Sequence, residues 1–159
     1  MLERKRKLDC ANGREKADLV LKNGNVLNVF TEEVLKADVA ICGDTIVGVG
    51  EYEGKEEIDC TGKYLVPGFI DAHVHIESCM AAPGELAKVL AKAGTTTIIA
   101  DPHEIVNVSG TKGMDYFLKC AAKLLVNVFF MVPSAVPATD VETNGCGEFL
   151  ASDMMKYVD

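Results

Sequence analysis

The 159-residue sequence contains no tryptophan, only three histidines, and no apolar run that reaches the roughly 18 residues of a membrane-spanning helix. Its N-terminus carries charged residues but lacks the apolar segment of a secretory signal. Lysine and arginine number 16 against 24 aspartates and glutamates, which gives a net charge of −8. An acidic balance of this kind argues against a basic nucleic-acid-binding surface. We therefore expect a cytoplasmic protein that binds neither membranes nor nucleic acids.

The six cysteines are scattered along the chain, and no two of them form a Cys-x-x-Cys pair. A small secreted domain would hold its cysteines in a disulfide framework, and a structural zinc site would place them in close pairs. Because neither pattern is present, we interpret the cysteines as reduced thiols.

Residues 1–16 differ from this acidic background because they include four consecutive basic residues, Arg4 to Lys7. A basic run can attract RNA or anionic lipid, but it is more commonly a solvated helix face or chain end. We interpret residues 1–16 as a helical or frayed N-terminal arm.

Residues 17–64 have the pattern of β-structure. Runs rich in β-branched and apolar residues flank two dipeptides that favour tight turns, Asn23-Gly24 and Gly43-Asp44, and predict two hairpins. The segment contains no histidine, and its carboxylates fall mostly at turns. We assign it a structural role, as a segment of a small β-sandwich.

Residues 65–159 alternate predicted strands with predicted helices, which is the pattern of an α/β protein with a parallel sheet. The expected strands are residues 65–76, 95–100 and 126–132, and the expected helices are residues 83–93, 111–124 and one beginning near residue 148. The last strand is continuously apolar, as strands buried on both faces are. The segment therefore predicts three successive βα units.

The first of these strands carries an unusual set of polar side chains. Side chains on a strand alternate between its two faces, so the run after residue 70 places four polar residues on one face: Asp71, His73, His75 and Glu77. Two histidines at this spacing lie about 6.6 Å apart along the strand, and their rings can converge on one cation. The spacing also fits an exposed strand face, but two of the three histidines in the chain belong to this pair. We predict that His73 and His75 bind a divalent metal, and that Asp71 and Glu77 orient the rings.

Polar residues also follow the next two predicted strands. Asp101, His103 and Glu104 come directly after the second strand, and Ser134 and Glu142 lie in the loop after the third. The carboxyl ends of parallel strands meet at one edge, where α/β proteins build their sites. We predict that Asp101, His103 and Glu104 are catalytic, through proton transfer or contacts with substrate and metal. The alternative for Asp101 and Glu104 is ordinary turn and first-turn helix chemistry.

Four sequence blocks follow one another along the chain: Pro67-Gly-Phe-Ile-Asp-Ala-His-Val-His75 continued by Ile76-Glu-Ser78, Gly94-Thr-Thr-Thr97, Ala100-Asp-Pro-His-Glu-Ile105, and Pro133-Ser-Ala-Val-Pro-Ala-Thr139 with Glu142-Thr-Asn-Gly145. The first block is similar to the opening signature of the amidohydrolase superfamily, which comprises metal-dependent hydrolases on a (β/α)8 TIM barrel. Together, and in this order, the blocks resemble the adenine deaminase family of that superfamily, and the resemblance covers roughly residues 17–150.

The resemblance implies hydrolytic deamination of adenine to hypoxanthine and ammonia, a reaction of purine salvage. It implies His73 and His75 as ligands of Mn²⁺, with Fe²⁺ or Zn²⁺ as alternatives, in a site that holds one or two ions. It places the loop with Ser134, Glu142 and Asn144 beside the adenine pocket, and it implies a homo-oligomer for the full-length enzyme.

The resemblance also bears on length. A (β/α)8 barrel typically needs about 250 residues, so 159 residues accommodate the N-terminal part of the β-sandwich and the first βα units of an incomplete barrel. Residues 105–159 contain no histidine, and the family's further ligands, a bridging carboxylate, two histidines and an aspartate, are expected from later strands. We expect the front part of a longer enzyme, inactive alone and a weak metal binder.

Two other interpretations remain open. One is another amidohydrolase, of the hydantoinase, dihydroorotase or guanine deaminase type, although the blocks around Asp101 and Ser134 argue against it. The other is a non-catalytic β/α binding module. The C-terminal sequence, which predicts an unfinished helix, and the single flank of the sandwich argue against a closed module.

Overall fold

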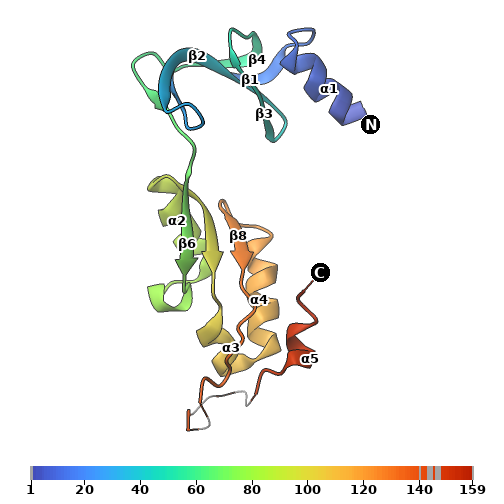
Figure 1. Ribbon diagram of the computed structural model, residues 1–159, viewed down its shortest axis with the longest axis vertical. Helices are drawn as coiled ribbons and strands as arrows, with labels where there is room; N and C mark the ends of the chain where they lie inside the picture. Colours follow the sequence, from blue (N-terminus) through green and yellow to red (C-terminus); the bar gives the residue numbers. More distant parts are fainter. Residues whose placement is uncertain (1, 140, 143–144, 146–147, 159) are drawn as a thin grey trace. The chain divides into compact units, whose positions relative to one another are not determined.

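The computed structural model describes residues 2–139, 141–142, 145 and 148–158. The chain forms two compact units, Met1–Pro67 and Gly68–Asp159, and each has its own β-sheet and its own buried cluster (Figure 1). Within the described ranges, no helix is long and apolar enough to cross a membrane. All the predicted catalytic, metal and substrate residues lie in the second unit.

The first unit consists of helix α1 (Leu2–Ala11) and a five-stranded sheet. The strands are β1 (Ala17–Asn28), β2 (Glu33–Cys42), β3 (Thr45–Gly50), β4 (Gly54–Asp59) and β5 (Tyr64–Leu65). Their order is β3-β2-β1-β4, with β5 also paired to β1. The hairpin predicted at Gly43-Asp44 is confirmed, since β2 and β3 pair antiparallel across it and Gly43 has a φ of 62°.

The hairpin predicted at Asn23-Gly24 is wrong, because β1 runs straight through this dipeptide. The pairing with β2 shifts between Leu21 and Gly24, which marks a β-bulge. Asn23 has a φ of 60°, and its N–H donates to Asp38 at 2.9 Å. A Cβ at Gly24 would lie 2.5 Å from a Leu65 methyl carbon. The positive φ that such a dipeptide favours is present at Asn23, but it forms a bulge and not the predicted hairpin turn.

Asp38 on β2 is the buried carboxylate of the first unit. It accepts hydrogen bonds from Lys22 Nζ at 2.6 Å and from the N–H groups of Asn23 and Tyr52 at 2.9 and 3.2 Å. Burial alone would raise the pKa of Asp38, but these donors outweigh it and the pKa lies below its usual value. The carboxylate is thus fully satisfied and holds the bulge against the sheet.

The predicted N-terminal arm contains α1, which packs on β2 and β3 and buries Cys10 completely. Its basic residues pair with carboxylates of the same unit: Arg6 with Glu15 and Asp18, and Lys7 with Asp44 at 2.7 Å. Arg6 and Lys7 therefore form ion pairs inside the first unit.

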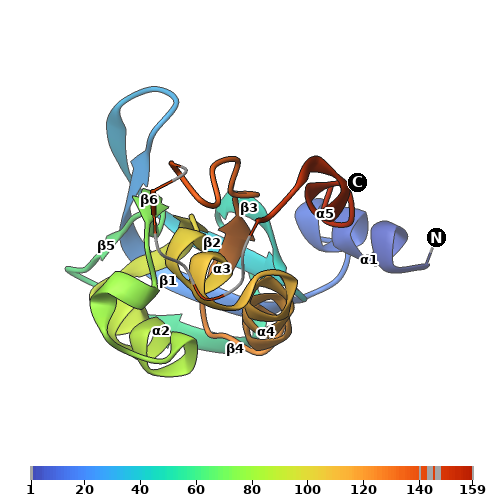
Figure 2. The ribbon, with the colours of Figure 1, turned by 90° about the horizontal axis from the view of Figure 1, so that it is seen from below.

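The second unit is built on a three-stranded parallel sheet in the order β6-β7-β8 (Figure 1). Its elements are β6 (Phe69–Val74), the short 3-10 turn η1 (Glu77–Cys79), α2 (Pro83–Lys92), β7 (Thr95–Ala100), α3 (His103–Ser109), α4 (Thr111–Ala121), β8 (Asn127–Phe130) and α5 (Ala151–Met154). Helix α2 packs against β7, α4 packs against β8, and the two helices contact each other (Figure 2). Their core joins Ile98 and Ala100 of β7 to Phe117 of α4.

Several boundaries in this unit differ from the sequence-based expectation: β6 begins at Phe69 and not at residue 65, β8 spans Asn127–Phe130 and not residues 126–132, and α5 begins at Ala151 and not near residue 148. Strand β6 ends at Val74, two residues early, because the chain turns into η1. Helix α4 ends at Ala121, three residues early. Helix α3 is not among the helices predicted above, because its short sequence follows a proline and lacks a long amphipathic repeat. This unpredicted helix carries both His103 and Glu104.

Candidate metal centre

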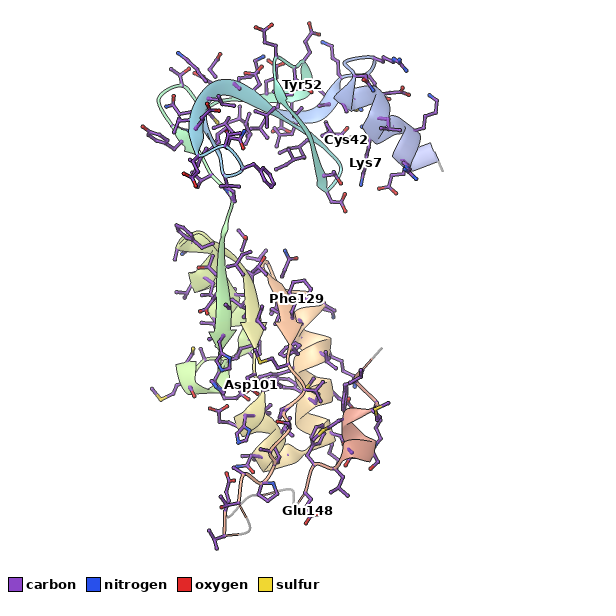
Figure 3. All side chains as sticks on the ribbon, viewed as in Figure 1. Lys7, Cys42, Tyr52, Asp101, Phe129 and Glu148 are labelled. Carbon is purple, nitrogen blue, oxygen red and sulfur yellow. The ribbon has the colours of Figure 1, made fainter. Side chains whose placement is uncertain are left out.

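The candidate site forms where β6 and β7 end. Val74 pairs with Ala100 in the last rung of the β6–β7 ladder, and the N–H of Asp101 donates to the Val74 carbonyl at 2.9 Å. This additional hydrogen bond fixes Asp101 beside His75. Figure 3 shows Asp101 at the carboxyl edge of the sheet.

The imidazoles of His73 and His75 converge at this edge. Their Nε2 atoms are 3.1 Å apart, and the rings meet edge to face at 62°. Metal–nitrogen bonds of about 2.0–2.1 Å to two atoms at this separation enclose an angle of about 95–102°. That angle lies between the roughly 90° of an octahedral and the roughly 109° of a tetrahedral site. The pair therefore fits one shared divalent cation.

Asp101 completes a group of three ligand residues. One ligand atom each from His73, His75 and Asp101 lies within 4.8 Å of the others. Asp101 Oδ1 is buried and has no hydrogen-bond partner among the described residues. A buried carboxylate oxygen without a donor is costly, and a cation would satisfy it. Two imidazoles and a carboxylate suit Mn²⁺, Fe²⁺ or Zn²⁺, and they lack the thiolates of a structural zinc site.

Glu104 contacts His75 directly. Its Oε2 lies 2.9 Å from His75 Nδ1, and its Oε1 accepts a hydrogen bond of 2.9 Å from Ser78 Oγ. This contact raises the pKa of His75, against the lowering effect of burial. Partial burial acts to raise the pKa of Glu104, but the bonds from Ser78, its own backbone and His75 bring it below its usual value.

The two residues predicted to orient the rings do something else. Asp71 Oδ1 accepts from the backbone N–H of His73 at 3.2 Å. Glu77 lies on η1, where Oε1 accepts from the N–H of Ile105 at 2.8 Å, while Oε2 is buried without a described partner. Burial raises the pKa of Glu77. The expected alternation fails because β6 has an irregular register after Asp71 and ends at Val74.

The residues predicted beside the substrate lie on the loop after β8. Glu142 Oε1 accepts from Asn107 Nδ2 at 2.9 Å, which ties the loop to α3, and its Oε2 accepts from the N–H of Ala138 at 2.5 Å within the loop itself. These bonds, that from Ala138 foremost, lower the pKa of Glu142 against partial burial, with a contribution from the nearby charge of His103. Ser134 is exposed on the same loop. Asn144 lies outside the described residues.

The structure therefore separates the predicted residues into two groups. His73, His75, Asp101 and Glu104 meet at one edge of the sheet, whereas His103 lies near Glu142, outside the group of three ligands. Sequence reasoning missed Ser78 and Asn107. Ser78 belongs to a quoted block and follows His75 by three residues, but nothing in the sequence distinguishes Asn107.

Imidazole and carboxylate ligands at the carboxyl edge of a parallel βα sheet are the arrangement of a metal centre in a (β/α)8-type hydrolase. The model of the Amidohydrolase family matches residues 64–156, more than half of the chain. The chain belongs to the amidohydrolase family.

Individual relatives match nearly the whole chain. It is 57% identical over 146 residues to a protein of Desulfitobacterium hafniense named adenine deaminase, covering 92% of this chain and 26% of that protein. It is 50% identical over 153 residues to one of the same name from Clostridium acetobutylicum, covering 96% of this chain and 27% of the relative. The chain thus spans about a quarter of the length of these relatives.

Solved structures confirm the fold. An N-acyl-D-glutamate deacylase from Bordetella bronchiseptica, in complex with zinc, superposes with a TM-score of 0.61 at 20% identity over 77% of this chain and 30% of its own. A D-aminoacylase superposes with a TM-score of 0.58 at 25% identity over 76% of this chain and 30% of its own. The predicted α/β fold with an incomplete barrel is confirmed.

Proposed function

We propose that this chain supplies the first ligands of an adenine deaminase active site, which hydrolyses adenine to hypoxanthine and ammonia in purine salvage. The observation that carries the proposal is the convergence of His73, His75 and Asp101 at the carboxyl edge of the sheet. The 57% and 50% identity to proteins named adenine deaminase supports the choice of substrate.

In this proposal His73 and His75 hold the metal through Nε2, and Asp101 adds a carboxylate oxygen. We assign Mn²⁺, with Fe²⁺ or Zn²⁺ as alternatives and room for a second ion once later strands contribute. A divalent cation at this position supplies a Lewis acid and brings the pKa of water toward neutrality.

The remaining residues bind or move protons. Asp101 offers one carboxylate oxygen to the ion, and its second oxygen can accept a proton from water. We assign to His103 the transfer of a proton to the departing exocyclic nitrogen, since an imidazole both accepts and donates one. Ser134 is exposed on its loop, and we assign to it a contact with the bound adenine. Glu142 is reassigned from a direct substrate contact to holding that loop.

The proposal includes the architecture around the site. Residues 1–16 form the N-terminal arm, residues 17–64 contribute to a β-sandwich, and residues 65–159 begin the barrel. The full enzyme is proposed to be a cytoplasmic homo-oligomer, and the isolated chain to be inactive, because the chain spans about a quarter of its relatives.

A chimera tests the function. Residues 1–150 of this chain replace the matching N-terminal segment of the Desulfitobacterium hafniense relative. Turnover is measured as ammonia release from adenine and guanine, and as hydrolytic ring opening of hydantoin and dihydroorotate. We expect turnover of adenine alone, abolished by His73→Ala. A folded, Mn²⁺-loaded chimera that prefers another substrate, or none, would overturn the proposal. If the chimera does not fold, Mn²⁺ binding by the chain itself decides whether the centre exists.

A further inference from the structure

We infer that Glu104, supported by Ser78, is a positioning residue that holds His75 in the one tautomer able to present Nε2 to a metal. The inference rests on the metal centre proposed above and concerns how that centre is prepared. It assigns Glu104 a role that acts through His75.

The first step concerns the proton on His75. Nδ1 lies 2.9 Å from Glu104 Oε2, and an ionised carboxylate only accepts hydrogen bonds. The hydrogen of the neutral imidazole must therefore be on Nδ1. Nε2 then carries the lone pair, and this is the atom that faces His73 Nε2 at 3.1 Å. The opposite tautomer would direct a hydrogen at the metal position.

The second step concerns what fixes Glu104. Its other oxygen accepts from Ser78 Oγ at 2.9 Å. One residue further along α3, the N–H of Ile105 donates to Glu77 Oε1 at 2.8 Å. Both Ser78 and Glu77 lie on η1, which begins two residues after His75. The turn that follows the ligand thus folds back and holds the start of α3, so that the carboxylate has a defined direction.

The third step excludes direct ligation as the main role of Glu104. Both of its oxygens are engaged, one by His75 and one by Ser78. It is also absent from the group of three ligand residues in the described part of the chain. Partners that orient a ligating imidazole typically change metal affinity by about 10–100-fold when removed.

The test uses the 159-residue chain and two readouts. Ring-nitrogen NMR reports which nitrogen of His75 is protonated, and assignment is simple because the chain has three histidines. Mn²⁺ affinity is measured from the EPR signal of free Mn²⁺. The variants are Glu104→Leu, which keeps bulk but removes the acceptor, Glu104→Gln, which keeps one acceptor oxygen, and Ser78→Ala. Glu85→Leu is the matched control, because Glu85 is an exposed first-turn glutamate of α2.

We expect Glu104→Leu to lose the Nδ1–H preference of His75 and to weaken Mn²⁺ binding by about 10–100-fold. Glu104→Gln should restore part of both, Ser78→Ala should weaken binding by a few-fold, and Glu85→Leu should leave both unchanged. An unchanged tautomer in a folded Glu104→Leu chain, or equal affinity in Glu104→Leu and the native chain, would overturn the inference. A native chain with the Nδ1–H tautomer that binds no Mn²⁺ would support the tautomer assignment and overturn the proposed metal centre.

Discussion

The two units of the chain differ in how far the hydrogen bonds of their buried side-chain oxygens are completed. In the first unit the buried carboxylate Asp38 receives three donors, and it lies beside a bulge that its hydrogen bonds hold in place. In the second unit three buried side-chain oxygens, on Glu77, Asp101 and Asn107, have no partner among the described residues. The buried carboxylate of the first unit thus has its hydrogen bonds completed, whereas that of Asp101 lacks a partner at the edge where we propose that a cation binds.

The largest expected effect comes from removing a ligand. His73→Ala or His75→Ala should weaken Mn²⁺ binding by the chain by more than about 100-fold, beyond the loss expected for an orienting residue. Equilibrium dialysis against Mn²⁺ measures this, with His103→Ala as the control, since His103 lies outside the ligand group. An equal loss of Mn²⁺ affinity in all three variants would contradict the assignment of His73 and His75, and not His103, as metal ligands.

The comparison of carboxylates predicts a difference in stability. Asp38→Asn should lower the free energy of unfolding of the first unit by about 2 kcal/mol, because it weakens hydrogen bonds to a charged, buried acceptor. Asp101→Asn should change the free energy of unfolding of the metal-free second unit by less than about 1 kcal/mol, because Oδ1 of Asp101 has no described hydrogen-bond partner that the substitution could remove. Hydrogen exchange of amides in β1 and β7, measured in the same samples, separates the two units. A larger loss for Asp101→Asn would contradict the comparison.

The loop after β8 gives a smaller, local effect. Glu142→Ala removes the acceptor of the Ala138 N–H and the partner of Asn107. The Ala138 amide should exchange about tenfold faster, which corresponds to roughly one hydrogen bond. Amides of β7 serve as the internal control. Unchanged exchange at Ala138 would show that Glu142 does not hold the loop and would return it to the candidates for substrate binding.

The smallest effect is a pH dependence of opposite sign in the two units. The lowered pKa of Asp38 stabilises the first unit above the ordinary carboxyl pKa, and that stability is lost as pH falls through the lower folded value. The raised pKa of Glu77 stabilises the second unit below the ordinary value, and that stability is lost as pH rises through the higher folded value. Urea unfolding with hydrogen exchange across this acidic range measures both slopes. Asp38→Asn and Glu77→Gln should each flatten one slope, and slopes of the same sign would refute the assignment.

Strand identity in the second unit was predictable because β-branched and apolar runs are bounded there by proline, glycine and polar residues. Residues 95–100 form the expected strand without any shift. In the first unit, Asn23-Gly24 was misinterpreted because a positive φ serves a bulge as well as a turn, and only the pairing partner decides between them. Local sequence cannot reveal that partner.

The site was predictable as a set of residues at one edge but not as a set of contacts. The histidine spacing and the position of Asp101 after a strand were sufficient to predict that these three residues lie at the same edge, although Asp101 was predicted as catalytic and only the histidines as metal ligands. The hydrogen-bond partner of His75 could not be predicted, because Glu104 belongs to a short helix and lies 29 residues away in sequence. Asp71 and Glu77 were closer in sequence, but the end of β6 turned both toward backbone N–H groups.

Helix α3 places two of these contacts on one short rigid element. Glu104 reaches His75 at its beginning, and Asn107, less than one turn later, reaches Glu142 on the loop that carries Ser134. The candidate metal site and the loop are thus both held by α3. Thermodynamic linkage requires reciprocity: whatever factor an ion adds to the affinity of a ligand at the loop, that ligand adds to the affinity for the ion.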